Sequence, residues 1–194
     1  MNLPNRLTIG RLVLCGGLVI SLQFENRYRG LTALVLFILA SITDWLDGML
    51  ARKWNLVTDF GKLMDPLADK VMVGAVYVTM VAHGLVPSWF VVCIIIREFL
   101  ITGLRTLAAT KGIILGAERI GKHKTFTQVA TAFVALLILT MRDMKISSET
   151  IDIWMMMILN PLILLTLLIT VYSGIAYFWK NRVLISNAST ENSL

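Results

Sequence analysis

The sequence predicts an all-α integral membrane protein, built as a bundle of six transmembrane helices, and three observations support this fold class. Hydrophobic residues make up 57% of the 194 residues and charged residues only 15%, whereas soluble domains carry about a quarter charged residues. Long apolar runs recur along the chain at lengths that suit the hydrocarbon core of a bilayer. Four aspartates, by contrast, gather around one junction between two of these runs. The runs predict the spans, and the aspartates predict where the chemistry lies.

Three apolar runs predict the spans of the first half of the chain, at residues 8–23, 31–50 and 61–83. Residues 1–11 mix apolar and polar side chains, which favours a short segment at the membrane interface that leads into the first span. A polar connection at residues 51–60 joins the second and third spans, so the end of one and the start of the other meet at one membrane face. His83, Gly84 and Pro87 mark the turn that follows.

Three further apolar runs predict spans at residues 88–108, 125–141 and 151–179. Residues 109–124 read as a basic loop and residues 142–150 as a polar turn. The last run contains Asn160-Pro161, where we expect the helix to be broken or tilted because proline removes one helical hydrogen bond. Residues 1–180 then form a single membrane domain, and residues 181–194 form a polar tail that we expect to be disordered.

The basic residues predict the orientation of the bundle, because cytoplasmic segments of membrane proteins are enriched in Lys and Arg. Six spans place both termini on one side. Of the 18 basic residues, the opposite side receives only Arg27, Arg29, Arg142 and Lys145. The pattern therefore predicts cytoplasmic N and C termini. It also explains the net charge of +6, which would suggest nucleic-acid binding in a soluble protein, and we expect no nucleic-acid partner.

Four carboxylates flank the junction between the second and third spans. Asp44 and Asp47 lie three residues apart, and Asp65 and Asp69 lie four apart, so each pair shares one face of a helix. Like charges between apolar segments repel strongly unless a cation binds among them. Hard oxygen ligands favour divalent Mg²⁺ or Mn²⁺, and two such ions would suit phosphoryl transfer.

Small and basic residues surround these carboxylates and point to a phosphate-bearing substrate. Gly48, Ala51 and Gly61 leave room for a ligand to approach the backbone, and Arg52 is placed to pair with a phosphate. Further cations at the same predicted membrane face are Arg97, Arg105 and Lys122. An ion-coupled transporter is an alternative use for carboxylates in a membrane. However, the sequence shows no internal repeat and places the carboxylates at one face.

These residues resemble the signature of the CDP-alcohol phosphotransferase family at every defined position. The match is Asp44-x-x-Asp47-Gly48-x-x-Ala51-Arg52, eight residues, and Gly61-x-x-x-Asp65-x-x-x-Asp69. Members of this family transfer a phosphoryl-linked group from a CDP-linked donor to an alcohol and release CMP. The resemblance implies a metal-dependent enzyme in which Asp44, Asp47 and Asp65 ligate the metal ions. Asp69 would complete the metal site and act as the base. Residues implied to hold the CDP moiety are Gly48, Ala51, Arg52 and Gly61.

Residues outside the signature predict the acceptor. Arg97, Arg105 and the basic stretch at residues 120–125, together with an N-terminal segment that ends at Arg11, resemble the bacterial members that use glycerol 3-phosphate. The expected reaction moves the phosphatidyl group of CDP-diacylglycerol to glycerol 3-phosphate at the cytoplasmic face of the bacterial cytoplasmic membrane. Arg97, Arg105 and Lys122 would bind the acceptor phosphate. Inositol phosphate, which also carries a phosphate, is the alternative acceptor, and the family resemblance also implies a possible homodimer in contact with membrane lipid.

Overall fold

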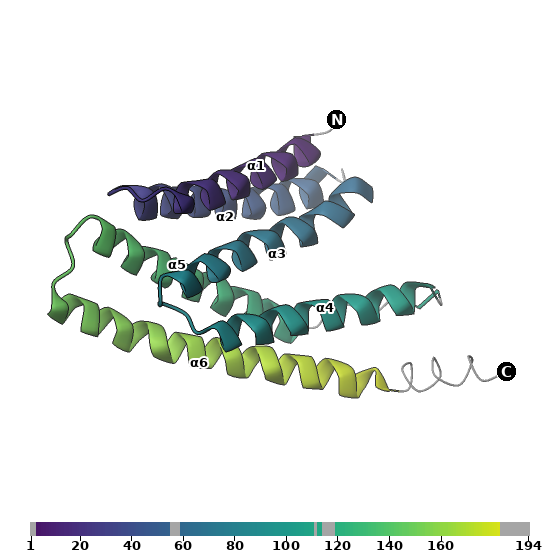
Figure 1. The fold of residues 1–194 in the computed structure, drawn as a ribbon. Coiled ribbons are helices and arrows are strands. Elements are labelled where there is room, and N and C mark those ends of the chain that lie inside the picture. Colours follow the sequence, from purple (N-terminus) through teal and green to yellow (C-terminus); the bar gives the residue numbers. More distant parts are fainter. Residues whose placement is uncertain (1–2, 55–58, 111, 114–118, 183–194) are drawn as a thin grey trace.

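The computed structural model describes the backbone of residues 3–54, 59–110, 112–113 and 119–182, and side chains within these ranges at 9–44, 49, 70–110, 112–113 and 124–182. These residues form six helices and no strand, which confirms the predicted all-α class (Figure 1). The helices are α1 (Leu3–Gln23), α2 (Arg29–Trp54), α3 (Asp59–Ala82), α4 (Ser88–Thr110), α5 (Arg119–Asp143) and α6 (Glu149–Lys180).

The helices pack as two groups that α5 connects. The helix α1 packs against α2 and α3, whereas α4 packs against α6 and α3. The helix α5 contacts α2 and α3 in the first group and α6 in the second. In Figure 1, α1 begins and α6 ends at the same end of the bundle, as an up-and-down arrangement of six helices requires.

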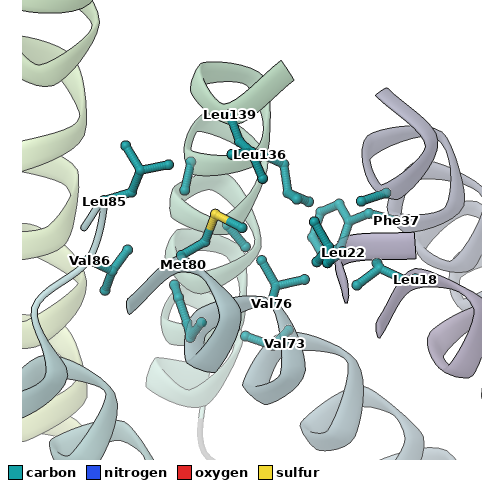
Figure 2. Packing of buried hydrophobic residues seen from close by; sticks show 14 of the residues in the cluster. Leu18, Leu22, Phe37, Val73, Val76, Met80, Leu85, Val86, Leu136 and Leu139 are labelled. Atoms are coloured by element: carbon teal, nitrogen blue, oxygen red, sulfur yellow. The ribbon is translucent and has the colours of Figure 1, made fainter. Parts of the chain in front are cut away.

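The apolar core lies where α1, α2, α3 and α5 meet (Figure 2). Its labelled members in the figure are Leu18, Leu22, Phe37, Val73, Val76, Met80, Leu85, Val86, Leu136 and Leu139. The rings of Tyr77 and Phe90, which belong to the same core, meet edge to face at 5.2 Å and extend it from α3 to α4. Gly30 brings α2 close to α5, because a Cβ on Gly30 would lie 2.7 Å from the backbone nitrogen of Thr140. Only glycine permits this approach without a shift of backbone.

The bundle buries hydroxyl groups and exposes large apolar side chains. On the α5–α6 interface the hydroxyls of Thr131 and Thr166, both fully buried, lie 2.9 Å apart. Phe99 on α4 and Trp154 and Tyr172 on α6 are exposed instead. Within the part of the chain that the structure describes, two helical segments are long and apolar enough to cross a bilayer, at Lys124–Asp143 and Glu149–Lys180. Buried polar groups inside an apolar exterior, with two such segments, indicate a membrane protein.

The end of the bundle opposite the start of α1 holds basic residues that the sequence predicts for the loops on the side away from the termini. Arg29 of α2 donates from Nε to both carboxylate oxygens of Asp143, at 3.0 and 2.9 Å. Arg142 binds Asp152 at 2.7 and 2.9 Å and so fixes the turn between α5 and α6. The Arg29–Asp143 pair therefore joins the α1–α2 and α5–α6 connections, which lie far apart in sequence.

Several features differ from the sequence prediction. The connection predicted at residues 51–60 is shorter, because α2 continues to Trp54 and α3 already begins at Asp59. The segment at residues 1–11 is not separate from the first span, because α1 is continuous from Leu3, and Pro4 suits a first helical turn where no amide donor is needed. The helix α6 is not broken at Pro161, which lies inside one continuous helix. The predicted basic loop at residues 109–124 is shorter than expected, because α5 already begins at Arg119. Of the predicted tail, residues 183–194 lie outside the described residues.

Candidate active site at the acidic end of the bundle

The two acidic pairs lie at one end of the bundle. Asp44 and Asp47 belong to the last part of α2, and Asp65 and Asp69 belong to the first half of α3. Only residues 55–58 separate the two helices, so these parts of α2 and α3 adjoin. Among the described side chains no three carboxylate, histidine or cysteine groups cluster. The side chains of Asp47, Asp65 and Asp69 lie outside the described set.

Asp44, the aspartate of the signature whose side chain is described, is tied to α1 by an ion pair. Nη1 of Arg11 lies 2.6 Å from Oδ1 of Asp44. Arg11 is fully buried, whereas the side chain of Asp44 is 42% exposed. A buried guanidinium requires a counter-charge, so this pair fixes the carboxylate while leaving part of it accessible. Arg11 lies in the predicted N-terminal segment, and its sequence pattern gives no sign of this contact.

Carboxylate oxygens are the ligands that Mg²⁺ and Mn²⁺ prefer. The described carboxylate, that of Asp44, is partly accessible, which is compatible with a role in binding such a cation. The residues expected to hold the CDP moiety lie on the same helices, where Gly48, Ala51 and Arg52 follow the carboxylates of α2 and Gly61 precedes those of α3. Their side-chain surroundings lie outside the described set.

A cationic cluster forms around Glu98 on α4. Its Oε1 lies 3.1 Å from Nη1 of Arg97 and also contacts Nζ of the buried Lys124 on α5. Its Oε2 lies 3.8 Å from Nζ of Lys70 on α3, and Lys70 also donates to the hydroxyl of Thr102. Three cations from three helices therefore converge on one carboxylate. We refer to Lys70, Arg97, Glu98 and Lys124 as the Glu98 cluster.

Two arginines of α4, Arg97 and Arg105, donate hydrogen bonds to hydroxyl groups of α6. Arg97 donates from Nη2 to the hydroxyl of Ser173 at 3.2 Å, and its stem packs so closely that a Cβ on Gly174 would lie 3.3 Å from its Cγ. Arg105 donates from Nε to the hydroxyl of Tyr177 at 3.2 Å, with its guanidinium 5.6 Å from the ring centroid. Because eight residues separate the two arginines, they lie on one side of α4. Hydroxyls of α6 thus orient both guanidinium groups.

The structure brings together only some of the basic residues predicted for the acceptor. Arg97 and Arg105 lie on the same side of α4, as expected for one pocket. Lys122 lies in the first turns of α5, and its side chain is outside the described set. Sequence reasoning gave no role to Lys70 and Lys124, although Lys70 directly follows Asp69 and Lys124 lies two residues after Lys122. This adjacency along α3 places the Glu98 cluster next to the acidic residues.

An apolar groove of about 670 Å³ opens between α4 and α6 on the outside of the bundle. Its lining includes Ile96, Leu100 and Phe178, with Arg97 and Arg182 among them. The groove therefore offers an apolar surface that borders the guanidinium groups. A molecule with a charged head and an apolar chain matches that combination.

Comparison with known proteins identifies the family. A family model described as CDP-alcohol phosphatidyltransferase matches residues 1–172, which include the whole acidic signature and the Glu98 cluster. The chain belongs to the CDP-alcohol phosphatidyltransferase family. This confirms the resemblance that the signature predicted.

Three curated relatives with the same name align along most of this chain. A protein of Bacillus subtilis (strain 168) named CDP-diacylglycerol–glycerol-3-phosphate 3-phosphatidyltransferase is 38% identical over 192 residues, which cover 93% of this chain and 95% of the relative. A protein of the same name from Rickettsia bellii is 33% identical over 177 residues, covering 91% and 93%. Another, from Rickettsia felis, is 39% identical over 136 residues, covering 70% and 75%.

Proposed function

We propose that this chain transfers the phosphatidyl group of CDP-diacylglycerol to glycerol 3-phosphate, releasing CMP and forming phosphatidylglycerophosphate. The observation that carries the proposal is the alignment with relatives of that name over more than nine tenths of both chains. The Glu98 cluster supports the choice of acceptor, because an alcohol with its own phosphate needs cations to bind it. Serine or choline would leave these cations without a phosphate.

In the proposed site the donor binds at the acidic end of α2 and α3. Asp44, Asp47, Asp65 and Asp69 hold a divalent metal, Mg²⁺ or Mn²⁺, as two ions. The metal, when bound, neutralises the pyrophosphate and stabilises the CMP that leaves. Residues proposed to hold the CDP moiety are Gly48, Ala51, Arg52 and Gly61. The acyl chains would extend into the lipid, where the α4–α6 groove offers an apolar surface.

The acceptor binds through its phosphate to cations on α3, α4 and α5. Arg97, Arg105 and Lys122 are the proposed contacts, and Lys70 and Lys124 join them because they belong to the same cluster as Arg97. Asp69 takes the proton from the acceptor hydroxyl, whose oxygen then attacks the phosphorus that carries the diacylglycerol. A new P–O bond forms, the bond to the CMP phosphate breaks, and CMP leaves with the electron pair.

The proposed placement in the membrane follows the charge distribution. All six helices would cross the bacterial cytoplasmic membrane with both termini and the acidic end at the cytoplasmic face, where the water-soluble acceptor is present. The exposed apolar side chains of α4 and α6 are compatible with lipid and with a second copy of the chain in a homodimer. Accessibility of single introduced cysteines to a membrane-impermeant thiol reagent tests the orientation, and cross-linking in the membrane tests the homodimer.

A CMP-release assay on the purified protein in detergent tests the reaction. The mixture contains CDP-diacylglycerol and Mg²⁺ or Mn²⁺, with glycerol 3-phosphate, inositol phosphate or serine as acceptor. We expect turnover when glycerol 3-phosphate is the acceptor and none when inositol phosphate or serine replaces it. Turnover with inositol phosphate would overturn the acceptor and keep the donor site, whereas no turnover with any acceptor would overturn both.

Asp69→Asn tests the proposed base. The variant should lose turnover, because an amide cannot accept the hydroxyl proton, while retaining binding of a CDP-linked donor. Donor binding is measured by equilibrium binding of labelled nucleotide. Turnover at the wild-type rate would remove Asp69 from the mechanism.

A further inference from the structure

Glu98 places a negative charge among the cations that are proposed to bind a phosphate. It contacts a guanidinium and two ammonium groups that come from α3, α4 and α5. A carboxylate at this position repels an anionic substrate and so opposes its binding. Its contacts therefore require an explanation beyond the binding of the acceptor.

Burial explains why a carboxylate is needed. The side chain of Lys124 is only 6% exposed and that of Glu98 only 19% exposed. An ammonium group buried to this extent is costly unless a counter-charge meets it. Lys70 and Arg97 add two more positive charges at the same carboxylate, and these would repel Lys124 in a medium of low dielectric constant. Glu98 thus stabilises the cationic cluster when no ligand is bound.

The net charge of the Glu98 cluster is opposite to that of the proposed ligand and similar in size. When both lysines are protonated, three cations and one carboxylate leave a net charge of two positive units within the Glu98 cluster. A phosphate monoester carries about −1.5 to −2 charge at neutral pH and offers three acceptor oxygens. Its oxygens form charge-assisted hydrogen bonds with the same groups that Glu98 engages, namely Arg97 and the two lysines. The carboxylate and the phosphate therefore compete for the same donors.

We propose that Glu98 is an internal counter-anion that pairs with Lys70, Arg97 and Lys124 in the empty site and gives up these partners to the acceptor phosphate when it binds. The proposal rests on the proposed function, in which these cations receive that phosphate. An incoming anion then displaces Glu98 only if it binds the three cations more strongly than the Glu98 carboxylate does. We refer to this requirement as the threshold for binding. A dianionic phosphate meets this threshold, whereas a single carboxylate such as that of serine does not.

Glu98→Gln tests the displacement by two separate measurements. Thermal unfolding of the detergent-solubilised protein is followed over a series of inorganic phosphate concentrations. Without phosphate the variant should melt below the wild type, because Lys124 loses its counter-charge. Phosphate should then raise its melting temperature more than that of the wild type. In the CMP-release assay its KM for glycerol 3-phosphate should fall by up to about tenfold, the equivalent of one strong competing interaction removed.

Two variants serve as controls for the charge. Glu98→Asp keeps the carboxylate and should restore a phosphate response close to that of the wild type. Asp152→Asn removes a carboxylate from the exposed ion pair with Arg142 at the opposite end of the bundle, and should leave the response to phosphate unchanged. A response in this second control equal to that of Glu98→Gln would overturn the proposal, because the effect would then be general.

Two results for Glu98→Gln would overturn the proposal, one in the KM and one in the response of the melting temperature to phosphate. A raised KM, or a phosphate response no larger than that of the wild type, would show that Glu98 only holds the cations in place. If this variant does not fold, Lys124→Met decides, because methionine fills the buried site and leaves Glu98 paired with Arg97 and Lys70. Its phosphate response should be weaker than that of the wild type, and an unchanged response would overturn the proposal. The thermal measurement needs no turnover, so it remains valid if the acceptor proves to be another phosphate.

Discussion

Replacing Arg11 by methionine tests whether the ion pair between α1 and α2 supports the acidic half of the site. Methionine keeps most of the buried volume of the arginine stem but removes the group that lies 2.6 Å from Asp44. Removing one partner of a fully buried pair costs about 3–5 kcal/mol of stability. Because Asp44 is 42% exposed, water can hydrate its carboxylate in the variant, so we expect a cost nearer about 1–2 kcal/mol.

The effect on activity should be larger than the effect on stability. Arg11 orients a carboxylate that is proposed to ligate the metal, and loss of such an orienting partner typically costs about 10–100-fold in metal affinity or activity. The assay is CMP release over a titration of Mg²⁺, with thermal unfolding measured alongside it. Arg11→Met should need more Mg²⁺ for half-maximal rate, and Arg11→Lys should lie between this variant and the wild type.

The matched control is Arg29→Met. This change breaks another arginine–aspartate pair between helices, with Asp143, but at the opposite end of the bundle. It should lower the melting temperature without changing the Mg²⁺ requirement. If Arg11→Met keeps both the wild-type rate and the wild-type Mg²⁺ dependence, the ion pair has no role in the site and our reasoning is refuted.

Three further predictions concern packing, acceptor binding and pH. Gly30→Ala should lower the melting temperature, because overpacking against the α5 backbone costs about 1–3 kcal/mol. Gly16→Ala is its control, since no atom lies within 4 Å of the new Cβ, and equal melting of the two variants would contradict the close approach. Arg105→Gln should raise the KM for glycerol 3-phosphate by up to about tenfold in the CMP-release assay, through loss of one charge-assisted contact. Tyr177→Phe keeps the ring beside the guanidinium and should raise the KM less; an unchanged KM in Arg105→Gln would remove Arg105 from the pocket. Burial and the positive charge of a neighbouring arginine lower the pKa of His83 below its ordinary value of 6.5, so the folded state favours the neutral ring. Stability should therefore fall as pH decreases from 6.5 through the lowered pKa, and melting curves of His83→Gln should lack this part of the acid dependence. Identical pH dependence in both proteins would contradict this assignment.

The number and order of the helices could be predicted from sequence because each apolar run is long and bounded by polar residues. The spacing of Asp44, Asp47, Asp65 and Asp69 correctly placed them on two successive helices whose adjoining parts meet. Boundaries were less accurate where polar residues continue a helix. The start of α5 at Arg119 lies within a basic stretch that hydropathy alone assigns to a loop.

The contacts between helices could not be predicted because they depend on packing rather than on spacing. Glu98 and Lys124 are 26 residues apart, and nothing in their local patterns shows that α4 and α5 bring them into contact. The burial of Arg11 likewise depends on the presence of Asp44 on another helix. A basic residue in a membrane sequence suits an interface as well as a buried pair, so its role follows only from the tertiary structure.

The hydroxyl partners of Arg97 and Arg105 both lie on α6, which a ribosome makes after the other five helices. A chain that ends before Ser173 and Tyr177 already contains the four signature carboxylates but lacks the groups that orient these two guanidiniums. During synthesis, the acidic half of the site is therefore translated well before the basic half can be completed. In this arrangement an unfinished chain lacks the two hydroxyl groups that orient the guanidiniums of the proposed acceptor pocket until translation has reached the last helix.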